Sequence, residues 1–376
     1  MENQEFHLSV VATSRNDNHG KDLLYRMQCF VDGFIEQCKK HDLSAELILV
    51  EWNPPENNPS LAEALRFPAD KGPCCIRIIR VSKEAHMKLN HADKIPLFQM
   101  IGKNVGIRRA RGKFVLATNI DILFSDNVMN FIKKKLKKGV LYRVDRLDVP
   151  ERLPEHDSFD EALRFCSKNL LRINHKAGTT VIVERTLAEK VIVGFRFCFN
   201  KFISVFKILF DVSLGKIVRG LISFRLQAPY LLRKNIRRIL CFFYPSNSLI
   251  LHTNACGDFT MLSREDWVEL RGYPEWNIFS WHLDSILLHQ ARQHKIIEKD
   301  LARRICIYHI EHEVGSGYSA EGAKALFNRL DSRGIPYLSD QDLRNLVSEM
   351  KKSPKKVVYN PDNWGMADQV FEEITI

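Results

Sequence analysis

Features that would carry a chain into or across a membrane are missing from this sequence. No charge-free apolar run reaches the roughly 20 residues that a membrane-spanning helix needs. The polar start Met1–Glu5 leads directly into an apolar run, without the basic residues, apolar stretch and small-residue cleavage site of an export signal. We therefore expect a protein that is not exported and lies in the cytoplasm.

Cysteine and glycine also fail to form the patterns that would fix a function. The nine cysteines are an odd number and lie mostly in apolar surroundings, as at Cys29, Cys38 and Cys306, which favours reduced, buried thiols over disulfides. The adjacent Cys74 and Cys75 lack the spacing of a zinc site. No glycine-rich phosphate loop with a basic residue follows the first apolar run, which counts against a sugar nucleotidyltransferase.

Charged residues are present in number but are unevenly distributed. The 376 residues are 45% hydrophobic and 27% charged, which is typical of a globular protein with one elaborated domain or two. The segment 190–245 carries +10 of the net charge of +11, because it holds eleven basic residues and the single acid Asp211. The rest of the chain is nearly neutral, so this segment is where an anionic partner would bind.

The N-terminal third alternates between strand-like and helix-like patterns. Continuous apolar runs predict strands at 7–13, 46–50, 75–81 and 113–119. Apolar residues spaced by three and four predict helices at 21–41 and 95–109. Strands that alternate with helices and are apolar on both faces indicate an α/β fold with a mostly parallel central sheet flanked by helices.

Polar residues follow three of these strands. They are the segments Thr13–Asn16 and Glu51–Asn53 and the pair Asn119 and Asp121. Ligands of open parallel sheets bind beyond the carboxyl ends of the strands, so these groups mark a candidate binding edge. Asn and Asp also form turns and helix caps, and Asn119-Ile-Asp121 taken alone leaves that interpretation open.

The order of several short segments resembles that of the GT-A nucleotide-sugar glycosyltransferases, especially family 2. The resemblance covers about residues 6–150 and 250–320. It is carried by Thr13–Asn16, Glu51–Pro54, Asn104–Gly112, Asn119–Asp121, Gly257–Trp267, Leu270–Glu275, Trp281–Asp284 and Tyr308–His309. It implies a Rossmann-like GT-A fold and a metal-dependent enzyme of the hexosyltransferase type. Such an enzyme transfers a sugar from a nucleotide-sugar donor, here a UDP-sugar, to a glycan or lipid-linked acceptor with inversion.

The resemblance also implies the residues that bind the nucleotide. The residues expected to bind base and ribose are Thr13, Arg15, Asn16 and Glu51. A uracil offers carbonyl and imide edges that short polar groups on rigid strand ends can pair with. Lys103 and Asn104 are expected to bind ribose or diphosphate, and Asn119 is expected to bind ribose or the cation. For Arg15 a solvated turn residue, and for Lys103 a surface lysine, remain alternatives.

A divalent cation is implied in the same way. Asp121 occupies the second position of the family's Asp-x-Asp motif, where Asn119 replaces the first carboxylate, and His309 occupies the place of a late metal-binding histidine. Oxygen ligands suit Mg²⁺ or Mn²⁺, and the imidazole favours Mn²⁺. His312 follows three residues later, so the segment Tyr308–His312 could also be a small metal cluster in its own right. For both His309 and His312, a strand-end histidine bonded to backbone remains an alternative.

The general base of an inverting transfer is expected at Asp284. The family places this carboxylate in a Glu-Asp motif at a helix start, but Leu283 replaces the Glu here, so a helix-capping role for Asp284 stays open. Asp258 is the reserve candidate, or a ligand of sugar hydroxyls. Trp281 and His282 belong to the acceptor side of the same motif.

The sequence divides into five expected segments. They are a nucleotide-sugar-binding half (1–150), a connecting segment (151–189), a basic amphipathic helical insertion (190–245), an acceptor and catalytic half (246–320) and a small helical C-terminal tail (321–376). Residues 195–243 are expected either to lie on an anionic membrane surface, peripheral to the cytoplasmic face, or to pack on the core. The glycines of 313–318 would permit a lid.

Two other functions compete with glycosyl transfer. One is a sugar nucleotidyltransferase. The other is a basic protein without catalytic activity that binds membrane or nucleic acid, for which the charge of 190–245 is the sole support. We expect no nucleic-acid partner, and release of nucleotide from a sugar donor separates the first function from both alternatives.

Overall fold

The computed structural model describes residues 6–182, 250–312 and 320–376. The expected basic insertion at 190–245, including its membrane-facing part at 195–243, and the expected lid at 313–318 lie outside the described residues. Within the described ranges, no helix combines the length and the apolar character needed to cross a membrane. The seven cysteines of these ranges are free thiols.

The main sheet has eight strands and is mostly parallel. Its strands, in spatial order, are β11 (Ile297–Asp300), β6 (Val140–Arg143), β10 (Phe259–Ser263), β4 (Phe114–Thr118), β1 (Leu8–Ser14), β2 (Ala45–Trp52), β3 (Cys74–Val81) and β13 (Glu372–Thr375). Only β10 and β13 run against the direction of the others. The four strands expected in the N-terminal third are all present, so the expected α/β fold class is confirmed.

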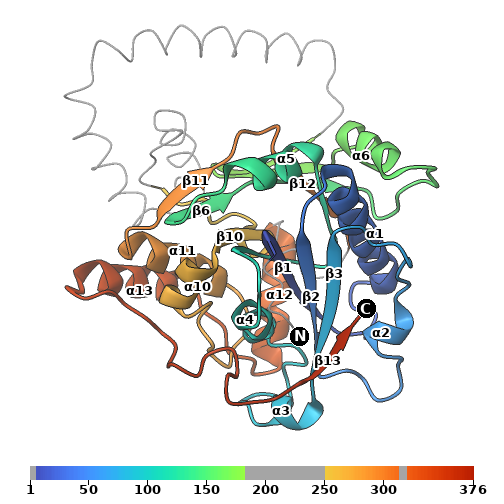
Figure 1. The fold of residues 1–376 in the computed structure, drawn as a ribbon. Coiled ribbons are helices and arrows are strands. Elements are labelled where there is room, and N and C mark those ends of the chain that lie inside the picture. The colour runs from blue at the N-terminus through green and yellow to red at the C-terminus, as the bar shows by residue number, and fades with distance from the viewer. Residues whose placement is uncertain (1–5, 183–249, 313–319) are drawn as a thin grey trace, which may run out of the picture.

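Helices cover both faces of this sheet, because its side chains alternate between the two. Val10 and Ala12 of β1 belong to the core that α1 (Leu23–His41) and α5 (Asp126–Lys135) complete. Val11, between them, belongs to the core on the opposite face, under α4 (Gln99–Arg108). Figure 1 shows α1 and α4 on either side of the strands.

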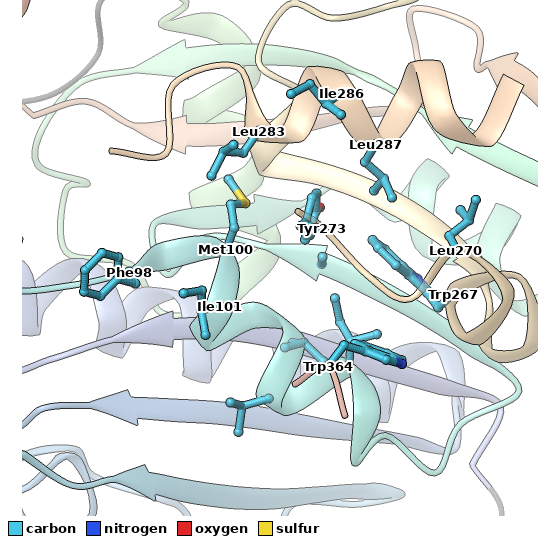
Figure 2. Packing of buried hydrophobic residues seen from close by; sticks show 14 of the residues in the cluster. Phe98, Met100, Ile101, Trp267, Leu270, Tyr273, Leu283, Ile286, Leu287 and Trp364 are labelled. Atoms are coloured by element: carbon cyan, nitrogen blue, oxygen red, sulfur yellow. The ribbon is translucent and has the colours of Figure 1, made fainter. Parts of the chain in front are cut away.

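The face under α4 is completed by elements from the C-terminal half. These are α10 (Arg264–Leu270), α11 (Leu283–Gln293), α12 (Ala320–Ser332) and α13 (Asp340–Lys352). Figure 2 shows side chains of α10 and α11 around Met100 and Tyr273, with Trp364 beside α4. Trp364 is only 2% exposed, and the Arg108 guanidinium lies over its ring.

A second, five-stranded sheet positions the late histidines. Its order is β5 (Ile122–Phe124), β12 (Cys306–Ile310), β7 (Asp145–Val149), β8 (Arg172–His175) and β9 (Gly178–Val181). Helix α6 (Phe159–Lys168) packs on it through Leu163 and Cys166. Strand β12 runs antiparallel to β5, with His309 opposite Ile122, and parallel to β7, with His309 opposite Asp148.

The C-terminal tail contains an element that the sequence does not predict. Two of the expected helices are α12 and α13, but residues 372–375 form β13 on the edge of β3. Ion pairs hold this short charged strand, with Arg77 Nε 2.6 Å from Glu373 Oε1 and Arg80 Nη1 2.7 Å from Glu372 Oε2. The short helices α2 (Leu61–Ala64), α3 (Lys83–Met87) and η2 (Cys256–Asp258) complete the described elements.

Candidate functional site

Ends of four strands of the main sheet meet at one edge. Strands β1, β2 and β4 are parallel, so their carboxyl ends lie together. Strand β10 is antiparallel to β4, and its first residue, Phe259, is paired with Thr118 at the end of β4. The residues just after β4 therefore lie beside those just before β10, and Asn119 donates its side-chain N–H to the Asp258 carboxylate.

Asp121, His309 and His312 form a cluster that we call the candidate centre. Asp121 lies on the short connection between β4 and β5, and the pairing of β12 with β5 places His309 against it. Asp121 Oδ2 is 3.6 Å from His309 Nε2 and 3.2 Å from His312 Nε2. Both expected metal ligands and the reserve His312 thus lie together.

Burial and charge give the candidate centre an unusual proton balance. Asp121 is 6% and His309 3% exposed. Burial would raise the pKa of Asp121, but His309 and His312 hold it well below the usual range. Burial and Arg146 would lower the pKa of His309, but Asp121 and Asp148 raise it to about 9.

The donor set of the candidate centre fits a divalent cation. One carboxylate and two imidazoles converge, each able to supply one ligand atom. Asp121 Oδ1 is buried and has no hydrogen-bond partner in the described structure, which leaves it available for a cation. Mixed nitrogen and oxygen ligands suit first-row ions such as Mn²⁺, and the carboxylate alone would suit Mg²⁺.

Asp148 fixes His309 from its other side. His309 Nδ1 is 3.3 Å from Asp148 Oδ1. The fully buried Asp148 is itself held by Arg172 Nε, which donates to Oδ2 at 2.8 Å, and by the Asn174 amide, which donates to the same oxygen at 3.0 Å. A carboxylate behind a histidine orients the ring and makes it a better metal ligand.

A chain of polar contacts lies beside the candidate centre and reaches η2, just before β10. The buried Lys103 of α4 donates to Asn119 Oδ1 and to the Gly257 carbonyl, each at 2.8 Å. The Asp258 carboxylate accepts from Asn119 and, at 2.7 Å, from Arg146 Nη1. Burial lowers the pKa of Lys103 to about 8, against the opposing effect of nearby carboxylates. Asn119 thus interacts with Lys103 and Asp258 rather than with the two histidines.

Asp284 lies at the start of α11, close to this chain. Its Oδ1 accepts a hydrogen bond from the Ser285 backbone N–H at 2.7 Å, as an acid in a first helical turn can do. Its Oδ2 would lie 3.2 Å from a Cβ at position 257, so only the absence of a side chain at Gly257 leaves space beside this oxygen. Both interpretations of Asp284, general base and helix-end acceptor, are compatible with these contacts.

No protein-family model matches the chain, and no curated protein matches it. Among solved structures, it is similar to residues 1–349 of S. aureus TarS in complex with UDP-GlcNAc, at 10% identity and a TM-score of 0.40, over 92% of this chain and 71% of that one. It is also similar to another structure of S. aureus TarS, at 11% identity and a TM-score of 0.39, over 92% of this chain and 42% of that one.

Three of the expected nucleotide-binding residues lie at the end of β1 and in the loop that follows it. The Thr13 hydroxyl donates to the Val50 carbonyl at 3.1 Å. Arg15 Nη1 donates to the Pro96 carbonyl at 3.0 Å, and the Asn16 amide donates to the Pro59 carbonyl at 2.9 Å. These bonds hold the loop after β1 against the segments after β2 and before α4.

Glu51 and Asn104 have their polar atoms engaged within the fold. Glu51 is fully buried, with Oε1 accepting from the Leu61 backbone N–H at 2.7 Å and Oε2 accepting from Arg80 Nε at 3.0 Å. The Asn104 amide donates to the Tyr273 carbonyl at 2.8 Å, and its oxygen accepts from the Tyr273 N–H at 2.9 Å. Asn104 thereby fixes the Gly272 turn, where φ is +70° and a Cβ would collide with the Asn104 side chain.

Trp281 and His282 connect the start of α11 to the tail. The Trp281 ring packs edge-on against Phe327 of α12, with centroids 5.2 Å apart, and its indole Nε1 is buried without a hydrogen-bond partner in the described structure. His282 Nε2 is 3.0 Å from Asp340 Oδ1 at the start of α13. These two residues therefore lie on the side of Asp284 that faces α12 and α13.

The sequence interpretation did not include Arg146 and Asp148. Both lie on β7, two residues apart, so they share one face of the strand, and that face is turned toward Asp258 and His309. The signal was present in the alternation Asp145-Arg-Leu-Asp148, which places charged residues on both faces of a short strand. Nothing in that pattern identifies the partners of these charges, because they come from η2 and β12.

Proposed function

We propose that this protein is a metal-dependent glycosyltransferase that uses a nucleotide-sugar donor, a UDP-sugar, and transfers the sugar with inversion to a glycan or lipid-linked acceptor. The observation that carries the proposal is the candidate centre at the carboxyl edge of a parallel sheet, with Lys103 and Asp284 close by. The resemblance of the ordered sequence segments to GT-A enzymes supports it.

In this proposal Asp121, His309 and His312 hold a Mn²⁺ or Mg²⁺ ion. When bound, the ion supplies positive charge that stabilises the diphosphate leaving group as the glycosidic bond breaks. Asp148 keeps the His309 ring in place through its contact with Nδ1. The loop Thr13–Asn16 would face the base and ribose, because it ends a strand adjacent to β4.

Lys103 adds a cation to the same region. It is fully buried, so its ammonium acts in surroundings of low polarity, and nearby Asp258, Asp284 and Asp121 oppose the effect of burial on its pKa. In our proposal its contact with Asn119 holds that amide toward the donor. The developing negative charge of the diphosphate would then meet both Lys103 and the ion.

Asp284 is the proposed general base that removes the proton from the acceptor hydroxyl. Asp258 and Asp284 both lie near Lys103 and are candidates for the general base. Asp258 is already bonded to Arg146 and Asn119. Those bonds occupy its carboxylate oxygens. Asp284 has no salt bridge within the described residues, so its carboxylate is the freer of the two to contact an acceptor hydroxyl.

The acceptor side of the proposal rests on sequence alone. A lipid-linked acceptor and peripheral contact with the cytoplasmic membrane face would use the positive charge of 190–245. Sedimentation with anionic vesicles should then decrease as salt is raised, since exposed charges are screened over about 10 Å at 0.1 M salt. Equal sedimentation with neutral vesicles would contradict the membrane part without affecting the donor site.

The experiment that tests the proposed activity measures nucleotide freed from a panel of UDP- and GDP-sugars, which includes UDP-GlcNAc, with Mn²⁺ or Mg²⁺. We expect release of UDP by the natural protein, and loss of release with chelator or in Asp121→Ala combined with His309→Ala. His41 and Asp126 form a matched histidine–carboxylate pair, 3.2 Å apart, remote from the centre. Their changes to Gln and Asn should leave release unchanged.

A binding measurement covers the case in which no acceptor is at hand. UDP affinity, measured by calorimetry, should fall when the ion is removed by chelator. UDP that binds equally well with and without a divalent ion, or does not bind at all, would overturn the proposed metal-dependent donor site.

A further inference from the structure

A second histidine–carboxylate cluster lies outside the candidate centre. It consists of Asp145 at the start of β7, His252 in the segment before η2, and Asp300 at the end of β11, and we call it the distal cluster. One donor atom of each residue lies within 4.8 Å of the others, and His252 Nδ1 is 2.8 Å from Asp300 Oδ1. Three segments far apart in the sequence thus converge on one point.

The distal cluster is separate from the candidate centre. On paired strands β7 and β12, Asp145 is opposite Cys306, whereas His309 is opposite Asp148. The two positions are three residues apart on β7, which corresponds to about 10 Å along a strand. No residue is shared between the two clusters, so an ion in one would not occupy the other.

The distal cluster is built like a cation site and not like a solvated surface group. His252 is fully buried, Asp145 is 9% exposed and the Asp300 side chain 18% exposed. His252 Nε2 is buried and has no hydrogen-bond partner in the described part of the chain. In that part, no lysine or arginine forms an ion pair with Asp145 or Asp300. Two carboxylates and one imidazole therefore lie together, and neither carboxylate is paired with a lysine or arginine of the described residues.

A buried guanidinium near the distal cluster is bonded to backbone. Arg143, fully buried on β6, donates from Nε, Nη1 and Nη2 to three backbone carbonyls, at 3.1, 3.2 and 3.2 Å. These carbonyls belong to His252, Cys256 and Asn254. Arg143 thus fixes the path of the segment that carries His252. It forms no ion pair with either carboxylate, although its charge, like those of Arg303 and Lys176, acts on them from nearby.

We propose that Asp145, His252 and Asp300 bind a divalent cation of the first transition row, and that this ion is structural. Ligand atoms about 2.1 Å from such an ion lie roughly 3.0–3.4 Å from one another. This range lies between the 2.8 Å contact of His252 with Asp300 and the 4.8 Å within which all three donor atoms lie. Small side-chain rotations therefore complete the site. The exposed edge of Asp300 gives the ion an entry and a place for water ligands.

The bound ion would tie the two sheets together next to the catalytic edge. It joins β7 of the second sheet to β11 of the main sheet through the segment 250–254. That segment continues directly into η2, which ends at Asp258. The distal cluster is thus a structural support for the loop on which Gly257 and Asp258 lie, independent of what the candidate centre binds.

Ion counting tests this inference. The protein is stripped with chelator, reloaded with Zn²⁺ and desalted, and the metal per chain is measured by mass spectrometry. We expect two ions in the natural protein, one in Asp145→Asn combined with Asp300→Asn, one in Asp121→Ala combined with His309→Ala, and none when the four changes are combined. The His41→Gln and Asp126→Asn pair is the control and should keep two.

Two further measurements keep the test decisive if the double variant folds poorly. Far-UV circular dichroism checks folding, and the single change His252→Gln, which conserves volume, should lower Zn²⁺ affinity at least tenfold at one of two sites. Co²⁺ substitution gives a visible absorption band for each bound ion, and the band lost in His252→Gln should persist in His309→Ala. An unchanged ion count in the Asp145→Asn, Asp300→Asn variant would overturn the distal site. If the natural protein instead binds one ion, and Asp121→Ala combined with His309→Ala does not change that count, the result counts against the proposed function and not against the distal site.

Discussion

The candidate centre and the distal cluster use the same residue types in opposite proportions. In the first, one carboxylate lies between two imidazoles, and in the second, one imidazole lies between two carboxylates. The proton balance is opposite as well. The pKa of Asp121 is lowered and that of His309 raised to about 9, whereas burial and Asp300 raise the pKa of Asp145 to about 7. Within the distal cluster the two carboxylates also differ, because burial would raise the pKa of Asp300 but the contact with His252 lowers it.

The largest expected effect comes from a residue that belongs to neither cluster. Changing Asp284 to Asn conserves its shape but removes its basicity. Turnover should fall by about two to four orders of magnitude, while UDP and metal affinities hardly change, because general base catalysis contributes only in the transition state. Steady-state kinetics with a responsive donor and acceptor, alongside calorimetry with UDP, measure both quantities.

The control for this variant is another acid in the first turn of a helix. Asp342 accepts from the Ser339 backbone N–H at 2.8 Å at the start of α13 and is exposed. Asp342→Asn should affect only stability, by about 1 kcal/mol or less. Near-normal turnover of Asp284→Asn, or an α-linked product from an α-linked donor, would contradict the assignment and direct attention to Asp258.

Metal affinity separates the two clusters by the next largest effect. Asp121→Ala should weaken Mn²⁺ binding at the candidate centre by at least about 100-fold, the upper end of what losing an outer-shell partner costs. The distal cluster should keep its affinity, since none of its donors changes. Titration of each variant followed by the paramagnetic signal of free Mn²⁺ gives both values, and equal weakening at both sites would show that they are coupled.

The pH dependence of metal binding should sharpen the comparison. A cation needs neutral His309, whose metal-free pKa is about 9, so Mn²⁺ affinity at the candidate centre should rise about tenfold per pH unit between pH 6 and 8. At the distal cluster, where the raised pKa of Asp145 is about 7, the rise should level off above pH 7. Calorimetry in buffers of different ionisation enthalpy counts the released protons. A flat profile at the candidate centre would contradict a protonated His309.

The smallest effect concerns the stability of the metal-free protein. The raised pKa of Asp145 means that its contribution to stability is present at low pH and is lost as pH rises through about 7. In chelator, Asp145→Asn should therefore lose less free energy of unfolding than the natural protein between pH 5 and 8, by a difference on the order of 3 kcal/mol or less. Thermal unfolding at both pH values measures this, and added Zn²⁺ should reverse the order of the two proteins.

Much of the fold follows from patterns that are local in the sequence. The strands of the parallel sheet are long apolar runs, and α1 shows its buried face at spacings of three and four, so both could be predicted. Strand β13 could not, since two of its four residues are glutamates whose partners, Arg77 and Arg80, lie on β3. Local propensity contains no information about such distant ion pairs.

In the candidate site, too, the local features could be predicted and the long-range contacts could not. The polar ends of the strands were visible in the sequence, and resemblance to a family indicated that His309 would join Asp121. The proximity itself comes from the register of β12 against β5, which no spacing reveals. Asn104 shows the opposite case, because it belongs to a motif expected to bind nucleotide, yet its amide bonds to Tyr273 in a buried turn.

Arg143 has a consequence for how this protein can change. It holds the segment 252–256 only through main-chain carbonyls, which every residue type possesses. These three bonds do not depend on the side chains of the segment, so Thr253, which is half-buried and absent from both clusters, could be replaced without losing them. Substitutions at such positions can accumulate while the backbone that leads to Asp258 keeps its course.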